Sequence, residues 1–132
     1  MAQPSQFELS TEQYLVASFY IAGTVADVQF WAAPAKCEVV SVREVHAVAG
    51  DNASAVTATI RRCQGTEAAT AGDDLLSTTI DLKGTALTEQ TPALTATTAN
   101  LTLEAGNRLS LDVTGNTATL AGVILTVLLK RA

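Results

Sequence analysis

Residues 55–62 read AVTATIRR, a stretch in which apolar side chains at every second position alternate with threonine or arginine. Because successive side chains of a β-strand point to opposite faces, this period of two predicts a strand that is buried on one face only. Val56, Ala58 and Ile60 are expected to face a core, with the polar residues between them pointing outward. The stretch therefore indicates a sheet protein whose strands pack by one face.

Similar runs, rich in β-branched and aromatic residues, lie on both sides of this stretch and end at turn-forming residues. They occupy residues 14–21, 25–31, 37–49, 75–82 and 122–130. The last run, GVILTVLLK, is apolar at nearly every position, which is typical of a strand in the centre of a sheet or beneath an interface. Residues 83–100 have no helical apolar stripe and many threonines, which predicts a loop with one irregular strand around Leu94.

Residues 101–113 predict a β-hairpin. Leu101–Leu103 and Leu109–Val113 flank the sequence Glu-Ala-Gly-Asn at 104–107, in which Gly and Asn tolerate the positive φ angles of a tight reversal. The leucines of the two runs are expected to meet on one face.

Seven or eight short strands with a turn about every ten residues are typical of an antiparallel β-sandwich or jelly roll. The chain has 132 residues, which leaves no room for a second core, so residues 14–132 are expected to form one domain. Residues 1–13 are mostly polar and are expected to form an extended N-terminal arm. The arm is either a frayed terminus or a strap that orders on a partner, with Phe7 and Leu9 as its anchors.

Composition limits the kinds of function. Only 16% of the residues are charged, against about 25% in typical soluble domains, so the surface is largely neutral and easily buried against another protein. The net charge of -5 argues against direct binding to nucleic acid, which requires a basic face. The first twelve residues do not resemble a secretory signal, and the apolar run at 120–129 is too short to span a membrane. We therefore expect a protein made in the cytoplasm, without a membrane partner, whose Cys37 and Cys63 are reduced and unpaired.

The groups that could carry chemistry form no catalytic or metal-binding motif. His46, the only histidine, lies inside a strand-forming run and is expected to be a hydrogen-bonded structural residue. No serine or cysteine lies in a nucleophile elbow, and Cys37, Cys63 and His46 lack the close spacings of zinc modules. Most carboxylates that a glycosidase could use are expected to be solvated on polar strand faces. They are Asp27, Glu38, Glu44, Asp81, Glu104 and Asp112. The sequence thus predicts no catalytic residue, cofactor or metal, and a protein that is not an enzyme.

The six aromatic residues are unevenly distributed. Five of them lie in the first two predicted strands, the last being Trp31, which ends the second of these strands beside Phe30. This clustering favours a core or a protein interface over an open sugar-binding groove. Phe30 and Trp31, together with Phe7 and Leu9 of the arm, are therefore the candidate interface residues.

The order of these features suggests a family. An N-terminal arm and an aromatic strand precede Phe30-Trp31-Ala32-Ala33-Pro34, which leads into the valine-rich run at 37–49. Thr/Ala-rich segments follow, then LEAGNRLSL at 103–111 and a final strand ending in LLKR at 128–131. This pattern resembles the jelly-roll head-decoration (cement) proteins of tailed bacteriophages. The resemblance implies a homotrimer on the exterior of the virion that binds the major capsid protein at three-fold positions and stabilises the assembled head.

Two other readings remain open from the residues. A carbohydrate- or receptor-binding β-sandwich of a tail fibre or adhesin would show exposed aromatic side chains on its loops or on one concave sheet. A different jelly-roll virion protein, such as a minor capsid protein or the base of a head fibre, would share the composition and strand pattern.

Overall fold

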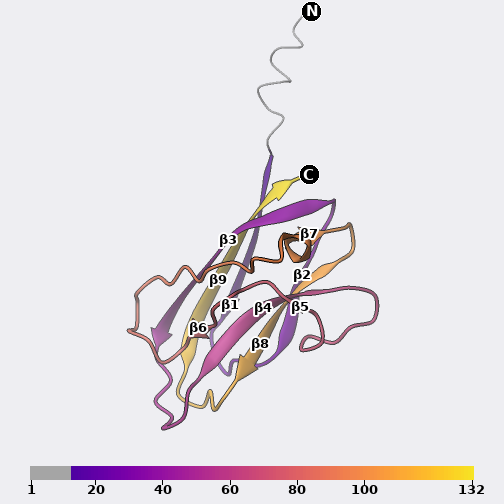
Figure 1. Cartoon of the computed structure of the whole chain (residues 1–132). Helices are drawn as coiled ribbons and strands as arrows, with labels where there is room; N and C mark the ends of the chain where they lie inside the picture. Colours follow the sequence, from indigo (N-terminus) through magenta and orange to yellow (C-terminus); the bar gives the residue numbers. More distant parts are fainter. Residues whose placement is uncertain (1–12) are drawn as a thin grey trace, which may run out of the picture.

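The computed structural model describes residues 13–132, and these residues form a β-sandwich (Figure 1). The expected antiparallel all-β fold is confirmed. The elements are β1 (Tyr14–Ile21), β2 (Val28–Ala32), β3 (Cys37–Val48), β4 (Thr57–Cys63), β5 (Asp73–Asp74), β6 (Ile80–Asp81), a 3-10 helix η1 (Thr98–Leu101), β7 (Thr102–Leu103), β8 (Arg108–Thr114) and β9 (Ala121–Arg131).

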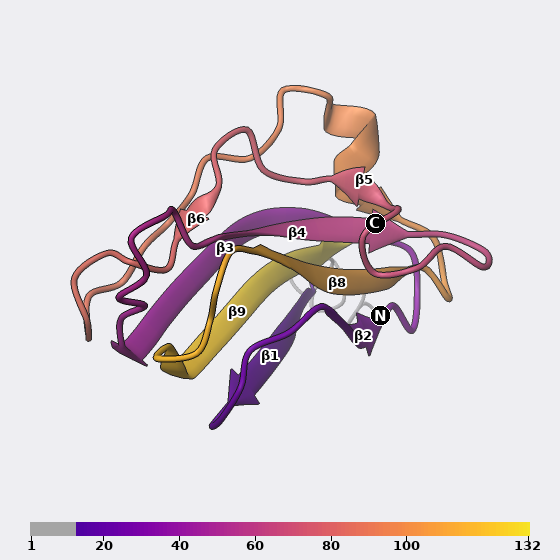
Figure 2. The ribbon, with the colours of Figure 1, turned by 90° about the horizontal axis from the view of Figure 1, so that it is seen from below.

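The strands form two sheets. Sheet A has the order β1-β9-β3-β7, and sheet B has the order β2-β8-β4-β5, with β6 also paired to β4 (Figures 1 and 2). The pairs β1–β9, β2–β8, β3–β7 and β4–β5 are nested in the chain like the rungs of one long hairpin, and successive pairs alternate between the sheets. This alternation is the arrangement of a jelly roll, built from eight of the strands with β6 as an addition.

β9 is the central strand of sheet A, as its apolar sequence predicts. On one side it pairs with all of β1, from Tyr14 opposite Lys130 to Ile21 opposite Val123. On the other side it pairs with β3, where a register shift between Val39 and Ser41 marks a β-bulge.

The core lies between the sheets and follows the predicted alternation. Val56, Ala58 and Ile60 are all buried, as the opening stretch indicates. Sheet A contributes alternate residues of β9 from the other side. They are Val123, Leu125, Val127 and Leu129.

The predicted hairpin at 101–113 is wrong. β7 pairs with β3 in sheet A, whereas β8 pairs with β2 and β4 in sheet B, so the turn at 104–107 crosses from one sheet to the other. Gly106 has a φ of 89°, as the turn chemistry predicts, but its N–H donates to Ala33 O in the neighbouring connection between β2 and β3. The leucines of the two runs are buried in the same core, to which β7 and β8 contribute from opposite sheets.

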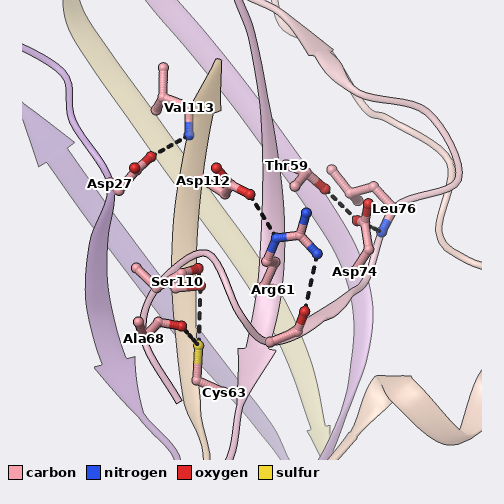
Figure 3. Close-up of polar contacts among 12 residues, drawn as sticks. Asp27, Thr59, Arg61, Cys63, Ala68, Asp74, Leu76, Ser110, Asp112 and Val113 are labelled. Carbon is pink, nitrogen blue, oxygen red and sulfur yellow. Dashed lines mark hydrogen bonds and ion pairs between the residues drawn. The ribbon is translucent and has the colours of Figure 1, made fainter.

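The predicted strand at 75–82 is largely wrong, since only Ile80–Asp81 forms a strand. Asp74 is the reason: its carboxylate accepts the N–H of Leu76 at 3.0 Å and the hydroxyl of Thr59, which turns the chain out of the ladder (Figure 3). Leu75 and Leu76 are therefore both buried, although they are consecutive. The irregular strand expected around Leu94 is present as a single bridge to Leu76.

The strand predicted at 25–31 begins only at Val28. The carboxylate of Asp27 accepts the N–H of Val113 at 2.7 Å, so a side chain replaces a ladder bond before β2 begins (Figure 3). The two cysteines are free and buried, with Cys37 on β3 of sheet A and Cys63 on β4 of sheet B. Phe7, Leu9 and most of the predicted arm lie outside the described residues.

Candidate protein-binding surface

The large apolar side chains that remain exposed are concentrated on one sheet. Within residues 13–132, six of the seven such residues lie on β1, β3 or β9 of sheet A, and Leu87 is the other. The six are Tyr14, Val16, Tyr20, Val40, Val48 and Ile124. Sheet A therefore differs from an ordinary half-buried sheet, in which the outer face is polar.

The strand register places these residues in adjoining rows. Val16 of β1 lies opposite Leu128 of β9, which lies opposite Ser41 of β3. Tyr20 lies opposite Ile124, which lies opposite Val45. Directly opposed side chains of antiparallel strands contact one another, so each row is a continuous band across three strands. We name the outer surface of β1, β9 and β3 that these rows form the A face.

Charged side chains of the A face are few. Arg43 lies in the row of Ser18 and Thr126, and its guanidinium is paired with Glu89 of the following loop at 3.1 Å. Glu38 and Lys130 share the row of Tyr14, at the end of the sheet. Arg43 lies between the rows of Val16 and Tyr20, so a partner that covers both rows also covers its ion pair with Glu89 and no other charged side chain of these three rows.

The A face continues around an open side of the sandwich. Within the described chain, β1 pairs only with β9 and β2 only with β8, so both are edge strands, and Figure 2 shows them on the same side of the molecule. Phe19 of β1 stacks on Phe30 of β2 with ring centroids 5.3 Å apart. All five aromatic residues that the structure describes therefore belong to these two edge strands.

Phe30 and Trp31, the candidate interface residues outside the arm, are both half-buried on β2. Phe30 closes the edge of the core through its stack with Phe19, and Trp31 lies opposite Leu109 after a register shift in β2. The exposed tyrosines of β1 were not identified as candidates from the sequence. The alternation at residues 14–21 places both tyrosines on the outer face of the strand. They form part of an apolar surface only because β9 and β3 lie beside β1.

The outer face of sheet B is closed by the chain itself. Arg61 donates to Asp112 at 2.8 Å and to the carbonyl of Gly72 at 3.1 Å (Figure 3). Ser110 donates to Ala69 O at 2.7 Å, and the thiol of Cys63 donates to Ala68 O at 3.3 Å. The loop between β4 and β5 thus lies over this sheet and satisfies its polar groups.

Glu44 contradicts the expectation of a solvated carboxylate. Its side chain is fully buried beside His46, and the carboxylate contacts Nδ1 of that ring at 2.8 Å. Burial raises the pKa of Glu44, while His46 and Gln90 act to lower this pKa. Nε2 of His46 is 2.8 Å from the carbonyl of Gly84, so both ring nitrogens have partners and the ring is the hydrogen-bonded strand residue that the sequence predicts.

The part of the chain that the structure describes holds no group of three or more His, Cys, Asp or Glu residues placed to bind a metal ion. Nor does any helix in residues 13–132 have the length and apolar character needed to cross a membrane.

Comparison with known proteins identifies the fold and no sequence family. No protein-family model matches the chain, and no curated protein matches it by sequence. Two solved structures are similar to it. A chain of the Ralstonia phage GP4 capsid superimposes with a TM-score of 0.64 and 13% identity, over 92% of this chain and 84% of that one. A chain of the cyanophage Pam1 capsid asymmetric unit superimposes with a TM-score of 0.53 and 14% identity, over 92% of this chain and 86% of that one. The chain therefore shares a β-sandwich fold with chains of two phage capsids.

Proposed function

We propose that this chain is a structural protein of a tailed-phage virion that binds the outer surface of the assembled head as a homotrimer and stabilises it. Two observations support the proposal. The fold is shared over nearly the whole chain with chains of two phage capsids. The main structural support is the A face, which is a neutral apolar surface of the kind that is covered in permanent assemblies.

The proposed trimer contact is the A face with the adjoining edge of β1 and β2. A face of three strands and eight residues measures about 26 Å by about 10–15 Å, and this area is roughly a third to a half of the ~800 Å² that each partner buries in a standard interface. The edge strands extend it with Phe30 and Trp31. Among residues 13–132 no strand pairs with the outer edge of β1, and the backbone groups of such an edge favour pairing with another chain.

Under this proposal the N-terminal arm binds the major capsid protein. Gln13 lies at the end of sheet A, where its carbonyl accepts the N–H of Arg131 at 2.7 Å, so β1 begins beside the C-terminal strand. Phe7 and Leu9 would anchor it. A protein that binds the closed shell and not the free subunits stabilises the shell by mass action, and many repeated contacts make a modest individual affinity sufficient.

Co-sedimentation tests the proposal. The purified full chain is mixed with expanded heads of the phage that carries its gene, and in parallel with an insoluble polysaccharide. We expect it to pellet with heads, to saturate at a fixed number of copies per head, and to raise the temperature at which the heads release their DNA. Binding to the polysaccharide without binding to heads would overturn the proposal in favour of a carbohydrate-binding module.

A further inference from the structure

A buried proton-binding pair holds the segment that covers one end of β3. Glu44 and His46 are alternate residues of β3, both point into the sandwich, and neither side chain has any solvent exposure. The atoms in contact are Oε2 of Glu44 and Nδ1 of His46, 2.8 Å apart. Nε2 of His46 lies 2.8 Å from the carbonyl oxygen of Gly84.

These contacts determine how many protons the folded pair holds. A carbonyl oxygen only accepts, so Nε2 of His46 must carry a hydrogen. The contact between Nδ1 and the Glu44 carboxylate also requires a hydrogen, because two bare acceptors repel each other at 2.8 Å. The folded pair therefore holds two protons and no net charge, whether the second proton resides on the ring or on the carboxyl group.

The same two residues secure the segment from Asp81 to Gln90. The backbones of Glu44 and Gln90 exchange two hydrogen bonds, and the Gln90 amide donates to Oε1 of Glu44 at 2.8 Å and to Asp81 O at 2.7 Å. His46 O accepts the N–H of Leu87 at 2.8 Å. Leu87 has a φ of 58°, an unfavourable conformation for leucine that these contacts maintain.

The ionisable groups of this covering segment are few. Asp81 opposes the negative charge of Glu44 and thereby raises the pKa of Glu44 further. Glu89 is paired with Arg43 on the outer side of β3, and Lys83 follows Asp81 in the chain. The carboxylate of Asp81 accepts the N–H of Lys83, and that of Glu89 is bonded to Arg43.

We propose that Glu44 and His46 form a proton latch, in which folding takes up one proton above about pH 6.5 and releases one below about pH 4.3. In the unfolded chain the two residues hold one proton above the ordinary imidazole pKa of about 6.5, two between about 6.5 and 4.3, and three below about 4.3. The folded pair holds two throughout. The pair therefore stabilises the fold most between these two pH values. This proposal does not depend on the proposed capsid role.

The sign of the effect follows from linkage. Above about pH 6.5 the folded state binds more protons than the unfolded state, so stability falls as the pH rises. Below about pH 4.3 the unfolded state binds more, so stability falls as the pH drops. The raised pKa of Glu44 agrees with the loss of stability above about pH 6.5. A carboxyl group that keeps its proton in the folded state stabilises the fold less as the pH rises.

The test compares the full chain with Glu44→Gln. A glutamine amide at position 44 can donate permanently to Nδ1 of His46 while its oxygen still accepts from Gln90, which makes the second proton non-ionisable. Between pH 6.5 and 8 we expect the folding equilibrium constant of the natural chain to fall by up to tenfold per pH unit, and that of Glu44→Gln to stay within threefold. Glu104→Gln, at an exposed position in the turn between β7 and β8 and away from the A face, is the matched control and should keep the slope of the natural chain.

Because His46 is the only histidine, its ring nitrogens provide a second test that needs no variant. In the folded natural chain we expect Nε2 of the ring to carry a hydrogen, as its contact with the carbonyl oxygen of Gly84 requires. Equal slopes for the natural chain and Glu44→Gln would overturn the proposal, as would an Nε2 of His46 that carries no hydrogen while the chain is folded.

Discussion

The outer faces of the two sheets differ in what covers them, although both sheets consist of antiparallel strands. On sheet B, the chain's own loop lies over β4 and β8, and Arg61, Asp112 and Ser110 have polar partners. On sheet A, the rows of Val16 and Tyr20 include large apolar side chains that stay exposed, namely Val16, Tyr20 and Ile124. The polar groups of sheet B are thus satisfied by folding, whereas sheet A keeps an exposed apolar face, which we propose is covered on assembly.

The largest expected effect comes from placing a charge on the A face. Val16→Glu would force a carboxylate into the proposed trimer contact, and we expect self-association to weaken by about 1,000-fold, or roughly 4 kcal/mol. Thr114→Glu, at an exposed position of β8 in sheet B, is the matched control and should associate like the natural chain. Sedimentation equilibrium measures both. Equal weakening by the two variants would erase the proposed distinction between the sheets.

The next effect concerns stability and sheet B. Arg61→Ala removes a partly buried guanidinium and leaves Asp112 and Gly72 O without their partner, which we expect to lower the free energy of unfolding by about 2 kcal/mol. Lys36→Ala removes an exposed ion pair of 3.9 Å with Glu104 and should cost less than about 0.5 kcal/mol. Urea denaturation measures both changes. A loss of trimer in Arg61→Ala at temperatures where it is folded would mean that sheet B also serves assembly.

Removing the arm should affect binding and leave stability unchanged. We expect a chain shortened to begin at Tyr14 to melt within a few degrees of the full chain, because it retains every described strand. Its affinity for heads should fall at least tenfold, or about 1.4 kcal/mol, and Phe7→Ala should reproduce much of that loss. Titration of heads with labelled protein measures this. Full affinity in the shortened chain would move the capsid contact to the sandwich itself.

The smallest effect concerns the thiol beneath the loop of sheet B. A serine hydroxyl can bond to Ala68 O and Ser110 in place of the Cys63 thiol, so Cys63→Ser should cost less than about 1 kcal/mol. Cys63→Ala, which removes both contacts and leaves a small void, should be the less stable of the pair. Thermal unfolding under reducing conditions ranks them. The reverse order would show that the site tolerates no polar group.

Much of the fold could be predicted because the signal is local. Alternation alone placed the strands at 14–21 and 37–49 to within one residue, and the apolar run at 122–130 predicted a central strand. The prediction of a hairpin at 101–113 was wrong because turn residues indicate that the chain reverses direction. They do not indicate which of the two sheets the next strand joins. The strand at 75–82 was wrong because its outcome depends on Thr59, a partner from another strand.

The candidate site was less predictable, for the same physical reason. Phe30 and Trp31 were found by composition, but the A face exists only once β1, β9 and β3 lie side by side, and no local pattern specifies that order. Glu44 reads as a solvated carboxylate in its own strand. Its burial depends on Gln90 and Gly84, which the chain brings back from about forty residues away.

The central claim is that the A face is covered by protein in the assembled state. The chain has two tyrosines, Tyr14 and Tyr20, and both are exposed on this face, at 55% and 61%. Mass spectrometry of iodinated peptides therefore reports directly on the A face, with monomeric Val16→Glu as the reference for a fully open surface. We predict that both tyrosines of the natural chain bound to heads are iodinated at least tenfold more slowly than those of the reference. Equal rates at both tyrosines would contradict the claim and leave the A face without a partner in the virion.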